Sequence, residues 1–222
     1  MSPNLKTRVY RGDSINVTYD THRCIHAEEC VNRLREVFNT NKRPWIQPDE
    51  AAPEQIADTI SHCPTGALHY VRVDGRAGEK VPAVNTITLQ EDGPVYLAGS
   101  LIIQNADGEH VHADTRLALC RCGASENKPF CDNAHLRIDF KATGTPTALE
   151  NDEDDKRSGT DLVITPTVNG SVRIEGSFEL HNSRGELLSR GWNTWLCRCG
   201  GSGNKPFCDG THRRNGFQAE SW

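Results

Sequence analysis

The sequence predicts a β-rich α+β protein, in which a small N-terminal α+β domain precedes two copies of one β-rich module. The repeat is the first observation: the run CRCGASENKPFCDNAH from Cys120 recurs without a gap as CRCGGSGNKPFCDGTH from Cys197. Short apolar and β-branched runs separated by turn residues fill both copies and predict strands. Residues 1–73 instead combine strand-like and helix-like periodicity, which predicts a separate domain.

Each copy begins with a predicted hairpin. The turn is Asn169-Gly170 in the second copy and Asp92-Gly93 at the matching place in the first. These dipeptides are strong hairpin signals because Asn, Asp and Gly tolerate positive φ. The predicted strands cover residues 162–165, 171–174, 178–180 and 194–196 of the second copy, and 87–89, 95–97, 101–103 and 116–119 of the first.

The N-terminal domain is predicted to contain a hairpin around Gly12-Asp13, two helices and a closing strand at 67–73. Apolar residues from Cys30 to Phe38 follow helical spacing, and a second helix is expected from Pro53 to the break before Pro64. The predicted organisation is therefore a domain at 1–73, a linker at 74–82, the first copy at 83–142, an acidic linker at 143–159 and the second copy at 160–222.

Composition excludes several classes of protein. The chain has 222 residues, a net charge of -5 and a mean hydropathy of -0.61. It contains no apolar span of about 20 residues and no apolar N-terminal stretch of the secretory kind, so we expect a cytoplasmic protein without a membrane partner. Its slight acidity and the lack of a basic stripe argue against a nucleic-acid partner.

The nine cysteines are the chemically informative residues. An odd number fits poorly with a complete set of disulfides, and clustered cysteines in a reducing compartment indicate metal or redox chemistry. They form three groups of three: Cys24, Cys30 and Cys63; Cys120, Cys122 and Cys131; Cys197, Cys199 and Cys208.

The spacing within each copy predicts two pairs of metal ligands. Residues i and i+2 of an extended chain point to the same side, so Cys120 and Cys122 can bind one metal atom together. Residues i and i+4 of a helical turn share a face, so Cys131 and His135 can bind a second. Three thiolates and one imidazole suit either a tetrahedral structural zinc or a 2Fe-2S cluster, and spacing alone leaves both open. The second copy repeats the pattern with Cys197, Cys199, Cys208 and His212.

Both segments resemble the CDGSH iron-sulfur domain of the mitoNEET-like family, whose pattern is C-x-C-x2-S-x3-P-x-C-D-G-x-H. The second copy matches it completely, and the first has Asn133 in place of the glycine. Asn is among the residues that accept a left-handed conformation, so we expect the turn to persist. The resemblance implies one 2Fe-2S cluster per copy, held by the three Cys and one His.

The resemblance also implies an architecture. Family members with a single motif form dimers in which strands of both subunits make a cap above two cluster sites. We therefore expect the two copies to form an intramolecular pseudo-dimer in a monomeric chain, with a β-strand cap and two cluster-binding lobes. Residues inside or beside the motif that are expected to tune the clusters are Lys128, Lys205, Asp132 and Asp209.

The lone imidazole of each set predicts sensitivity to acid. Imidazole binds a metal only when deprotonated, and its reference pKa of about 6.5 lies near cellular pH. We therefore expect the sites of His135 and His212 to be acid-labile.

The N-terminal cysteines form an incomplete ferredoxin pattern. Small ferredoxins use C-x2-C-x2-C followed at a distance by C-P, and here Ala27 stands where the middle ligand would be. The alternative is three unrelated buried cysteines. The segment from Val9 to Tyr70, with CIHAEECV, EVFNTNKRPWI and CPTGAL, resembles the divergent single-cluster ferredoxin-like family, described as binding a 4Fe-4S cluster.

Three thiolates fit either a 3Fe-4S cluster or a 4Fe-4S cluster whose fourth iron takes water or another side chain. His26, Glu28 and Glu29 are near enough in sequence to Cys24 and Cys30 to supply that ligand.

No pattern in the sequence predicts an enzyme. There is no nucleotide-binding glycine loop, no G-x-S-x-G elbow, and no cysteine outside the three groups to act as a nucleophile. The first expectation is an electron-transfer or redox-relay protein. The alternatives are a cluster carrier or redox, pH or iron sensor, and a structural zinc-binding protein. The sequence identifies neither the redox partner nor an apo-protein that would accept a cluster.

Overall fold

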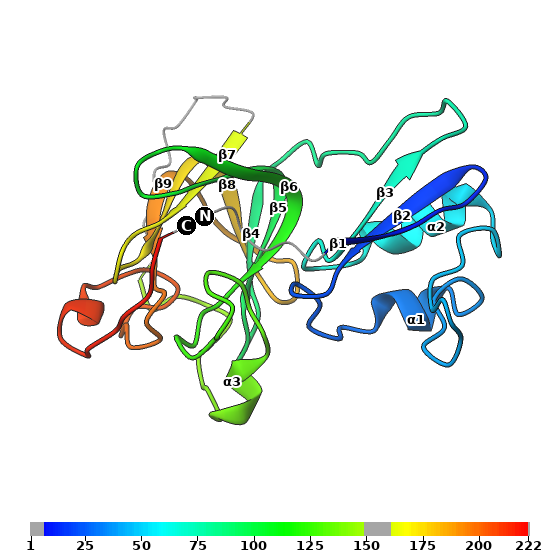
Figure 1. Cartoon of the computed structure of the whole chain (residues 1–222). Coiled ribbons are helices and arrows are strands. Elements are labelled where there is room, and N and C mark those ends of the chain that lie inside the picture. The colour runs from blue at the N-terminus through cyan, green and yellow to red at the C-terminus, as the bar shows by residue number, and fades with distance from the viewer. Residues whose placement is uncertain (1–6, 149–160, 222) are drawn as a thin grey trace. The chain divides into compact units, whose positions relative to one another are not determined.

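The computed structural model describes residues 7–148 and 161–221 (Figure 1). The chain divides into two compact units, with the boundary between Val81 and Pro82, and each unit is described by itself. The part of the predicted acidic linker at 149–159 lies outside the described residues. No helix in the described part of the chain is both long and apolar enough to cross a membrane.

The N-terminal unit is a three-stranded antiparallel sheet with two helices. The sheet has the order β1-β2-β3, and β2 in the centre pairs with both neighbours. The predicted hairpin, the helix from Pro53 and the closing strand are all confirmed. The elements are β1 (Thr7–Tyr10), β2 (Ile15–Asp20), α1 (Glu29–Arg33), α2 (Pro53–Ser61) and β3 (Leu68–Arg72).

The first predicted helix is shorter than its apolar spacing indicated. Helix α1 ends at Arg33, although Val37 and Phe38 are completely buried. Phe38 instead forms a single antiparallel bridge with Ile46. The prediction of a continuous helix as far as Phe38 was therefore wrong, because beyond α1 the chain keeps one helical hydrogen bond, from Phe38 N–H to the Leu34 carbonyl at 2.9 Å, and Phe38 then pairs with a distant segment.

Helix α2 anchors the core of this unit. Pro53 occupies its first turn, where a missing N–H has no consequence, and Ile56 and Ile60 on one face are completely buried. They pack in one cluster with Ile15 and Val17 of β2. Burial of each such side chain stabilises the fold by about 1.5–3 kcal/mol.

The second unit carries both copies of the repeat in one six-stranded sheet (Figure 1). Two short helical turns follow the sheet strands. The elements are β4 (Thr86–Leu89), β5 (Val95–Gln104), β6 (His110–Leu119), α3 (Ala134–Arg137), β7 (Asp161–Pro166), β8 (Val172–Asn182), β9 (Leu187–Leu196) and the 3-10 turn η1 (Thr211–Arg213).

The strands of the two copies are interleaved. Strand β4 pairs antiparallel with β5 of its own copy and parallel with β8 of the other. In the same way β7 pairs antiparallel with β8 and parallel with β5. These four strands close a ring, and β6 and β9 extend it by pairing with β5 and β8.

Two glycines allow β5 and β8 to change partner halfway along. Strand β5 pairs with β4 up to Ala98 and with β7 from Ser100 onward. Between them Gly99 has φ 147°, and a Cβ there would collide with Asn85; Gly176 of β8, with φ 120°, would collide with the Asp161 carbonyl. The strands predicted separately on either side of these positions are therefore single bent strands.

The interior of the sheet unit contains apolar side chains from both copies. Along β5 every second residue is buried, and the inward residues of β4, β5, β7 and β8 form one cluster. Ile87 and Leu97 of the first copy and Ile164 and Ile174 of the second are at most 1% exposed within it. Neither copy therefore has a core of its own.

Candidate metal centres

Each C-x-C segment begins where an edge strand ends. Cys120 follows β6 directly and Cys197 follows β9. The chain then returns to the end of the same strand, where Cys131 N–H donates to the Ala118 carbonyl at 2.9 Å and Cys208 N–H to the Trp195 carbonyl at 2.7 Å. The strand end thus brings the third cysteine of each copy back to the first two.

The candidate ligands lie as two pairs in each copy. Cys120 Sγ and Cys122 Sγ are 3.8 Å apart, and Cys131 Sγ and His135 Nδ1 are 3.6 Å apart. Among the side chains that the structure describes, no three of His, Cys, Asp and Glu converge as they would around a single ion. The matching separations in the second copy are 3.8 Å for Cys197 and Cys199, and 3.3 Å for Cys208 and His212.

A left-handed residue turns the chain between the third cysteine and the histidine. Asn133 has φ 65° and Gly210 has φ 82° at the same place in the two copies. Each precedes a short helical turn, α3 or η1, that carries the histidine. Asn133 therefore adopts the conformation that the family's glycine provides.

The three N-terminal cysteines line one cavity. Cys24 lies in the loop after β2, Cys30 in α1 and Cys63 just after α2, and Ala27 lines the same cavity. In the loop between the first two, His26 and Glu28 have φ of 54° and 61°. The fold thus brings Cys63 to Cys24 and Cys30, which are far from it in sequence.

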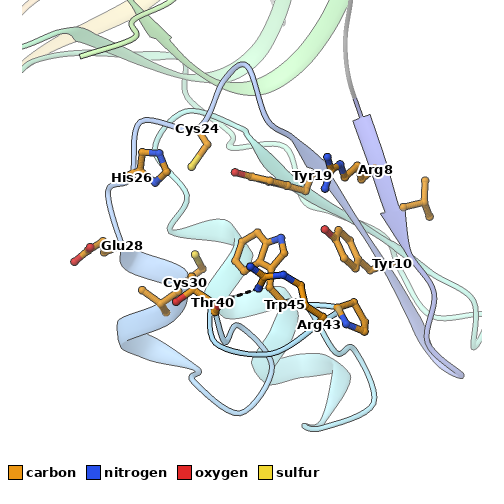
Figure 2. Close-up of a pocket in the computed structure, with 13 residues that line it drawn as sticks. Arg8, Tyr10, Tyr19, Cys24, His26, Glu28, Cys30, Thr40, Arg43 and Trp45 are labelled. Carbon is orange, nitrogen blue, oxygen red and sulfur yellow. Dashed lines mark hydrogen bonds between the residues drawn. The ribbon is translucent and has the colours of Figure 1, made fainter. Parts of the chain in front are cut away.

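The predicted fourth-ligand candidates are placed differently. Glu28 and Glu29 line the cavity of the three thiols, whereas His26 lines a larger neighbouring cavity. Figure 2 shows His26 beside Cys24 at the edge of that larger cavity.

Comparison with known proteins agrees with this geometry. The family described as "Divergent 4Fe-4S mono-cluster" matches residues 10–73, and the family described as "Iron-binding zinc finger CDGSH type" matches residues 92–136 and 169–213. The chain belongs to both iron-sulfur families. It joins one divergent 4Fe-4S domain to two CDGSH repeats in tandem.

Relatives support the N-terminal assignment. "Uncharacterized protein YjdI" of Escherichia coli, strain K12, is 40% identical over 63 residues, which cover 28% of this chain and 83% of that protein. YjdI of Escherichia coli O157:H7 matches to the same extent. No solved structure matches the chain significantly.

The aspartates of the two CDGSH repeats hold the ligand loops. Asp132 accepts hydrogen bonds from the Glu126 and Ala134 N–H groups, both at 2.9 Å. Burial alone would raise the pKa of Asp132, but these hydrogen bonds outweigh it and the pKa is lowered. Asp209 accepts from Gly203 at 2.8 Å and Thr211 at 3.0 Å, and its pKa lies well below its usual range, chiefly through the Thr211 hydroxyl.

The lysines of the NKPF loops connect the two repeats. Lys205 Nζ donates to the Ser202 carbonyl at 2.6 Å, and Lys128 Nζ donates to that of Ser125. Each ammonium also lies over an aromatic ring of the opposite repeat at 5.8 Å, Lys128 over Phe217 and Lys205 over Phe140. Any tuning of a metal site by these lysines stays a prediction.

Sequence reasoning missed two arginines that stand between the paired cysteines. Arg121 and Arg198 are each 1% exposed. Arg121 donates to the Gln90 and Thr143 carbonyls at 2.9 and 2.5 Å. The four acceptors of Arg198, at 2.5 to 3.2 Å, are the carbonyls of Gly170, Glu220, Thr167 and Ala219.

These guanidinium groups carry a buried charge that their hydrogen bonds do not neutralise, because carbonyl oxygens are uncharged. Burial lowers the pKa of each arginine to about 10. The charges of Cys197 and, after it, Asp92 oppose this effect at Arg121, and the charge of Cys120 opposes it at Arg198, so the opposing thiol belongs to the other repeat in both cases. The signal available in the sequence was the identical arginine in both C-R-C segments.

The two C-x-C segments touch through their backbones. Gly123 and Gly200 have φ of 82° and 73°. A Cβ on Gly123 would collide with the Cys199 carbonyl, and one on Gly200 with the Cys122 carbonyl. Only glycine fits at both positions, so the two CDGSH sites are direct neighbours.

The environment of the thiols shifts their pKa values in both directions. Burial raises the pKa of Cys131 and of Cys197 to about 11, and in the N-terminal cavity that of Cys30 to about 11. A hydrogen bond with Cys120 instead lowers the pKa of Cys122 to about 7. Since metal cations displace protons from such thiols, the donor set fits a metal cluster.

Proposed function

We propose that the chain is an electron-transfer or redox-relay protein with three iron-sulfur clusters. Two 2Fe-2S clusters take three Cys and one His each, and the N-terminal triad takes a 3Fe-4S or 4Fe-4S cluster. The observation that carries the proposal is the arrangement of each CDGSH ligand set as two close pairs, at 3.3 to 3.8 Å within a pair. A bound cluster would supply a one-electron redox couple.

This paired arrangement supports a cluster over structural zinc. A zinc ion draws four ligand atoms to within about 2.0–2.3 Å of one point, whereas a 2Fe-2S cluster takes two ligands on each iron. Cys120 with Cys122 and Cys131 with His135 supply such pairs. Structural zinc remains the third and weakest candidate.

The buried arginines support the same proposal. A cluster held by three thiolates and a neutral imidazole is anionic, and an uncompensated cation in a protein interior is costly. Arg121 and Arg198, both 1% exposed, supply positive charge beside the thiols, and the hydrogen bonds described above join them to uncharged carbonyls. The role of the two arginines would be to balance the negative charge of the clusters, while the carbonyls hold the guanidinium groups in position.

Contact between the two CDGSH sites favours electron exchange within the unit. The C-x-C backbones meet at Gly123 and Gly200, and the lysine of each repeat reaches over a ring of the other. We infer that residues 83–142 and 160–222 act as an intramolecular pseudo-dimer, which the reciprocal pairing of β4 with β8 and of β7 with β5 supports. The strand ring would be its cap, and the two ligand loops its lobes.

The N-terminal site supports a cluster with one iron that lacks a thiolate. Three thiols and the methyl group of Ala27 line the same cavity. Glu28 and Glu29, which also line it, and His26, which lies beside Cys24, are the candidates to complete the fourth iron. All nine cysteines are free thiols, which suits the reducing cytoplasm that we propose as the location.

A second candidate function is that of a cluster carrier or a redox, pH or iron sensor. It is favoured by the single imidazole in each CDGSH set, because protonation would remove that ligand. His212 lies in a partly exposed turn, and this placement supports release at acid pH. In this case the partner would be an apo-protein that accepts a cluster, and in the first a protein redox partner.

Anaerobic purification with iron and sulfide analysis tests these alternatives. We expect about seven or eight irons per chain, reversible reduction by dithionite, and a paramagnetic signal before reduction if the N-terminal cluster is 3Fe-4S. Transfer of intact clusters to an apo-ferredoxin without reversible reduction would favour the carrier. About four irons would eliminate the N-terminal cluster, and colourless protein containing zinc would overturn the proposal.

A further inference from the structure

The N-terminal unit contains a second, larger cavity beside the thiol cavity (Figure 2). Its volume is about 680 Å³, within the range of small-molecule sites. Cys24 and Cys30 line both cavities, but Cys63 lines only the thiol cavity. The larger cavity therefore adjoins the thiol cavity, with two of the three thiols in its wall.

Three aromatic rings form a fixed wall of this cavity. Tyr10, Tyr19 and Trp45 all line it. Tyr19 and Trp45 pack edge to face with ring centroids 5.0 Å apart, and Tyr10 packs on Trp45 in the same manner at 6.4 Å. Such pairs hold the rings in place, so a planar ligand would meet a preformed apolar surface.

Two arginines supply positive charge to the same cavity. Arg8 comes from β1 and Arg43 from the loop before Trp45, and Figure 2 shows Arg8 near Tyr19 and Tyr10 and the Arg43 guanidinium beside Trp45 and Thr40. Arg43 Nη1 donates to the Thr40 and Lys42 carbonyls at 2.8 and 2.7 Å. Among the described residues neither guanidinium has a carboxylate partner, so both are available to an anion.

The remaining wall does not neutralise this charge. Glu28 is the one acidic residue that lines the cavity in the described part of the chain. Figure 2 shows Glu28 on the opposite side of the cavity from Arg8, beyond Cys30, with Arg43 between them. An anionic group would therefore be attracted to Arg8 and Arg43, and repelled from Glu28.

We propose that this cavity binds a planar aromatic molecule that carries a phosphate or carboxylate group. The ring system of the ligand packs against Tyr10 and Trp45, and its acidic group pairs with Arg8 and Arg43. The ligand then lies against Cys24 and Cys30, and its contact with a cluster there rests on the function proposed above.

Flavin mononucleotide is a suitable probe, because it joins a planar ring system to a phosphate. Anaerobically purified full-length protein is titrated by calorimetry with flavin mononucleotide, with riboflavin, which lacks the phosphate, and with inorganic phosphate. We expect one flavin mononucleotide per chain, and binding of riboflavin weaker by about tenfold or more. Binding is also expected to change the paramagnetic spectrum of the N-terminal cluster.

The double variant Arg8→Gln/Arg43→Gln assigns the binding to this cavity. We expect it to weaken flavin mononucleotide by about tenfold or more and to leave riboflavin unchanged. Arg76→Gln is the matched control, since Arg76 is an exposed arginine of the same unit that pairs with Glu54 away from the cavity. Both variants alter exposed side chains, so neither should impair folding.

Absence of flavin mononucleotide binding, or equal affinity in the double variant, would overturn the proposal. Protein with full iron content that fails to bind overturns the cavity assignment and leaves the cluster standing. Protein with about four irons that still binds in an arginine-dependent manner supports the cavity and eliminates the N-terminal cluster.

Discussion

The two CDGSH repeats present the same ligands at the same spacing in different surroundings. In the first repeat Cys131 is 4% and His135 9% exposed, whereas Cys208 and His212 of the second are only half-buried. The histidine stands on the four-residue helix α3 in the first repeat and on the 3-10 turn η1 in the second. The motif thus sets which residues pair, and the local chain path sets how far water reaches them.

The buried arginine makes more hydrogen bonds in the repeat whose histidine is more exposed. Arg198 of the more open repeat donates to four carbonyls, and Arg121 to two. Two of the Arg198 acceptors, Glu220 and Ala219, belong to the C-terminal segment. In the second repeat, the arginine therefore ties the C-x-C segment to residues 219 and 220. In the first repeat, the arginine makes fewer hydrogen bonds.

The largest expected effect comes from removing one ligand per repeat. Cys131→Ser and Cys208→Ser should each lower the iron content by about two per chain, because a hydroxyl is a poor ligand for either iron. Iron analysis and visible absorbance measure this. We expect the untouched repeat to keep its cluster, and loss of about four irons from either variant would show instead that the sites assemble only together.

The next effect concerns the buried arginines. Arg198→Met leaves four carbonyls without their donor and Arg121→Met leaves two, and a buried unpaired polar group costs about 1–3 kcal/mol. We expect Arg198→Met to lower the free energy of unfolding by about 3 kcal/mol or more, and Arg121→Met by less.

Denaturant titration of both arginine variants, with Arg173→Met as the control, measures this difference. Arg173 is partly exposed on β8 and pairs with Glu175, so its replacement should change the free energy of unfolding by about 0.5 kcal/mol at most. Equal losses for the two buried arginines would contradict the comparison between the repeats.

Acid should release the second cluster before the first. Burial lowers the pKa of His135, against the opposing effect of Asp132. A lowered pKa keeps the imidazole neutral to lower pH, and only neutral imidazole binds metal, so the first site should persist further as pH falls. Visible absorbance after a drop below about pH 6 follows this loss in His135→Cys and His212→Cys.

Each histidine variant should stabilise its own site against acid. If both variants lost absorbance as quickly as the parent protein, histidine protonation would not be the cause. Slower loss in His212→Cys than in His135→Cys would agree with the predicted order, because His212→Cys leaves His135 as the acid-sensitive ligand, and that site should persist to lower pH.

The smallest effect is expected from exchanging the left-handed residues. Asn133→Gly removes the strain of a side chain at φ 65°, and Gly210→Asn introduces it at φ 82°, where no atom lies within 4 Å of the added Cβ. Both changes should stay below about 1 kcal/mol and have opposite signs. Thermal unfolding of the two variants side by side measures them, and a larger loss in Gly210→Asn would reveal a role for Gly210 beyond the turn.

Much of the local structure could be predicted from the sequence. Turn residues located the hairpins near Asp92 and Asn169, and Pro53 marked the start of α2. The spacing of the candidate ligands predicted the pairs Cys120 with Cys122 and Cys131 with His135, which lie close together in the structure. These features depend on backbone geometry over a few residues, which local sequence controls.

Other features could not be predicted because they depend on distant partners. Phe38 is buried by its bridge to Ile46 rather than by a helix, and Gly99 marks a change of strand partner that looks like a break in the sequence. The second cavity beside Cys24 is likewise built from segments far apart along the chain. Periodicity reports burial, but it does not identify the segment that covers a residue.

By itself, the sequence determined the duplication and the pairing of the candidate ligands, since covalent spacing limits which side chains share a strand or a helical turn. Only the tertiary structure decided that β4 and β7 are exchanged between the repeats, that Gly123 and Gly200 meet the opposite cysteines, and that Arg121 and Arg198 are buried beside them. The physical reason is that neither repeat has enough apolar surface for a core of its own, so each completes its fold, and the setting of its metal site, with the other.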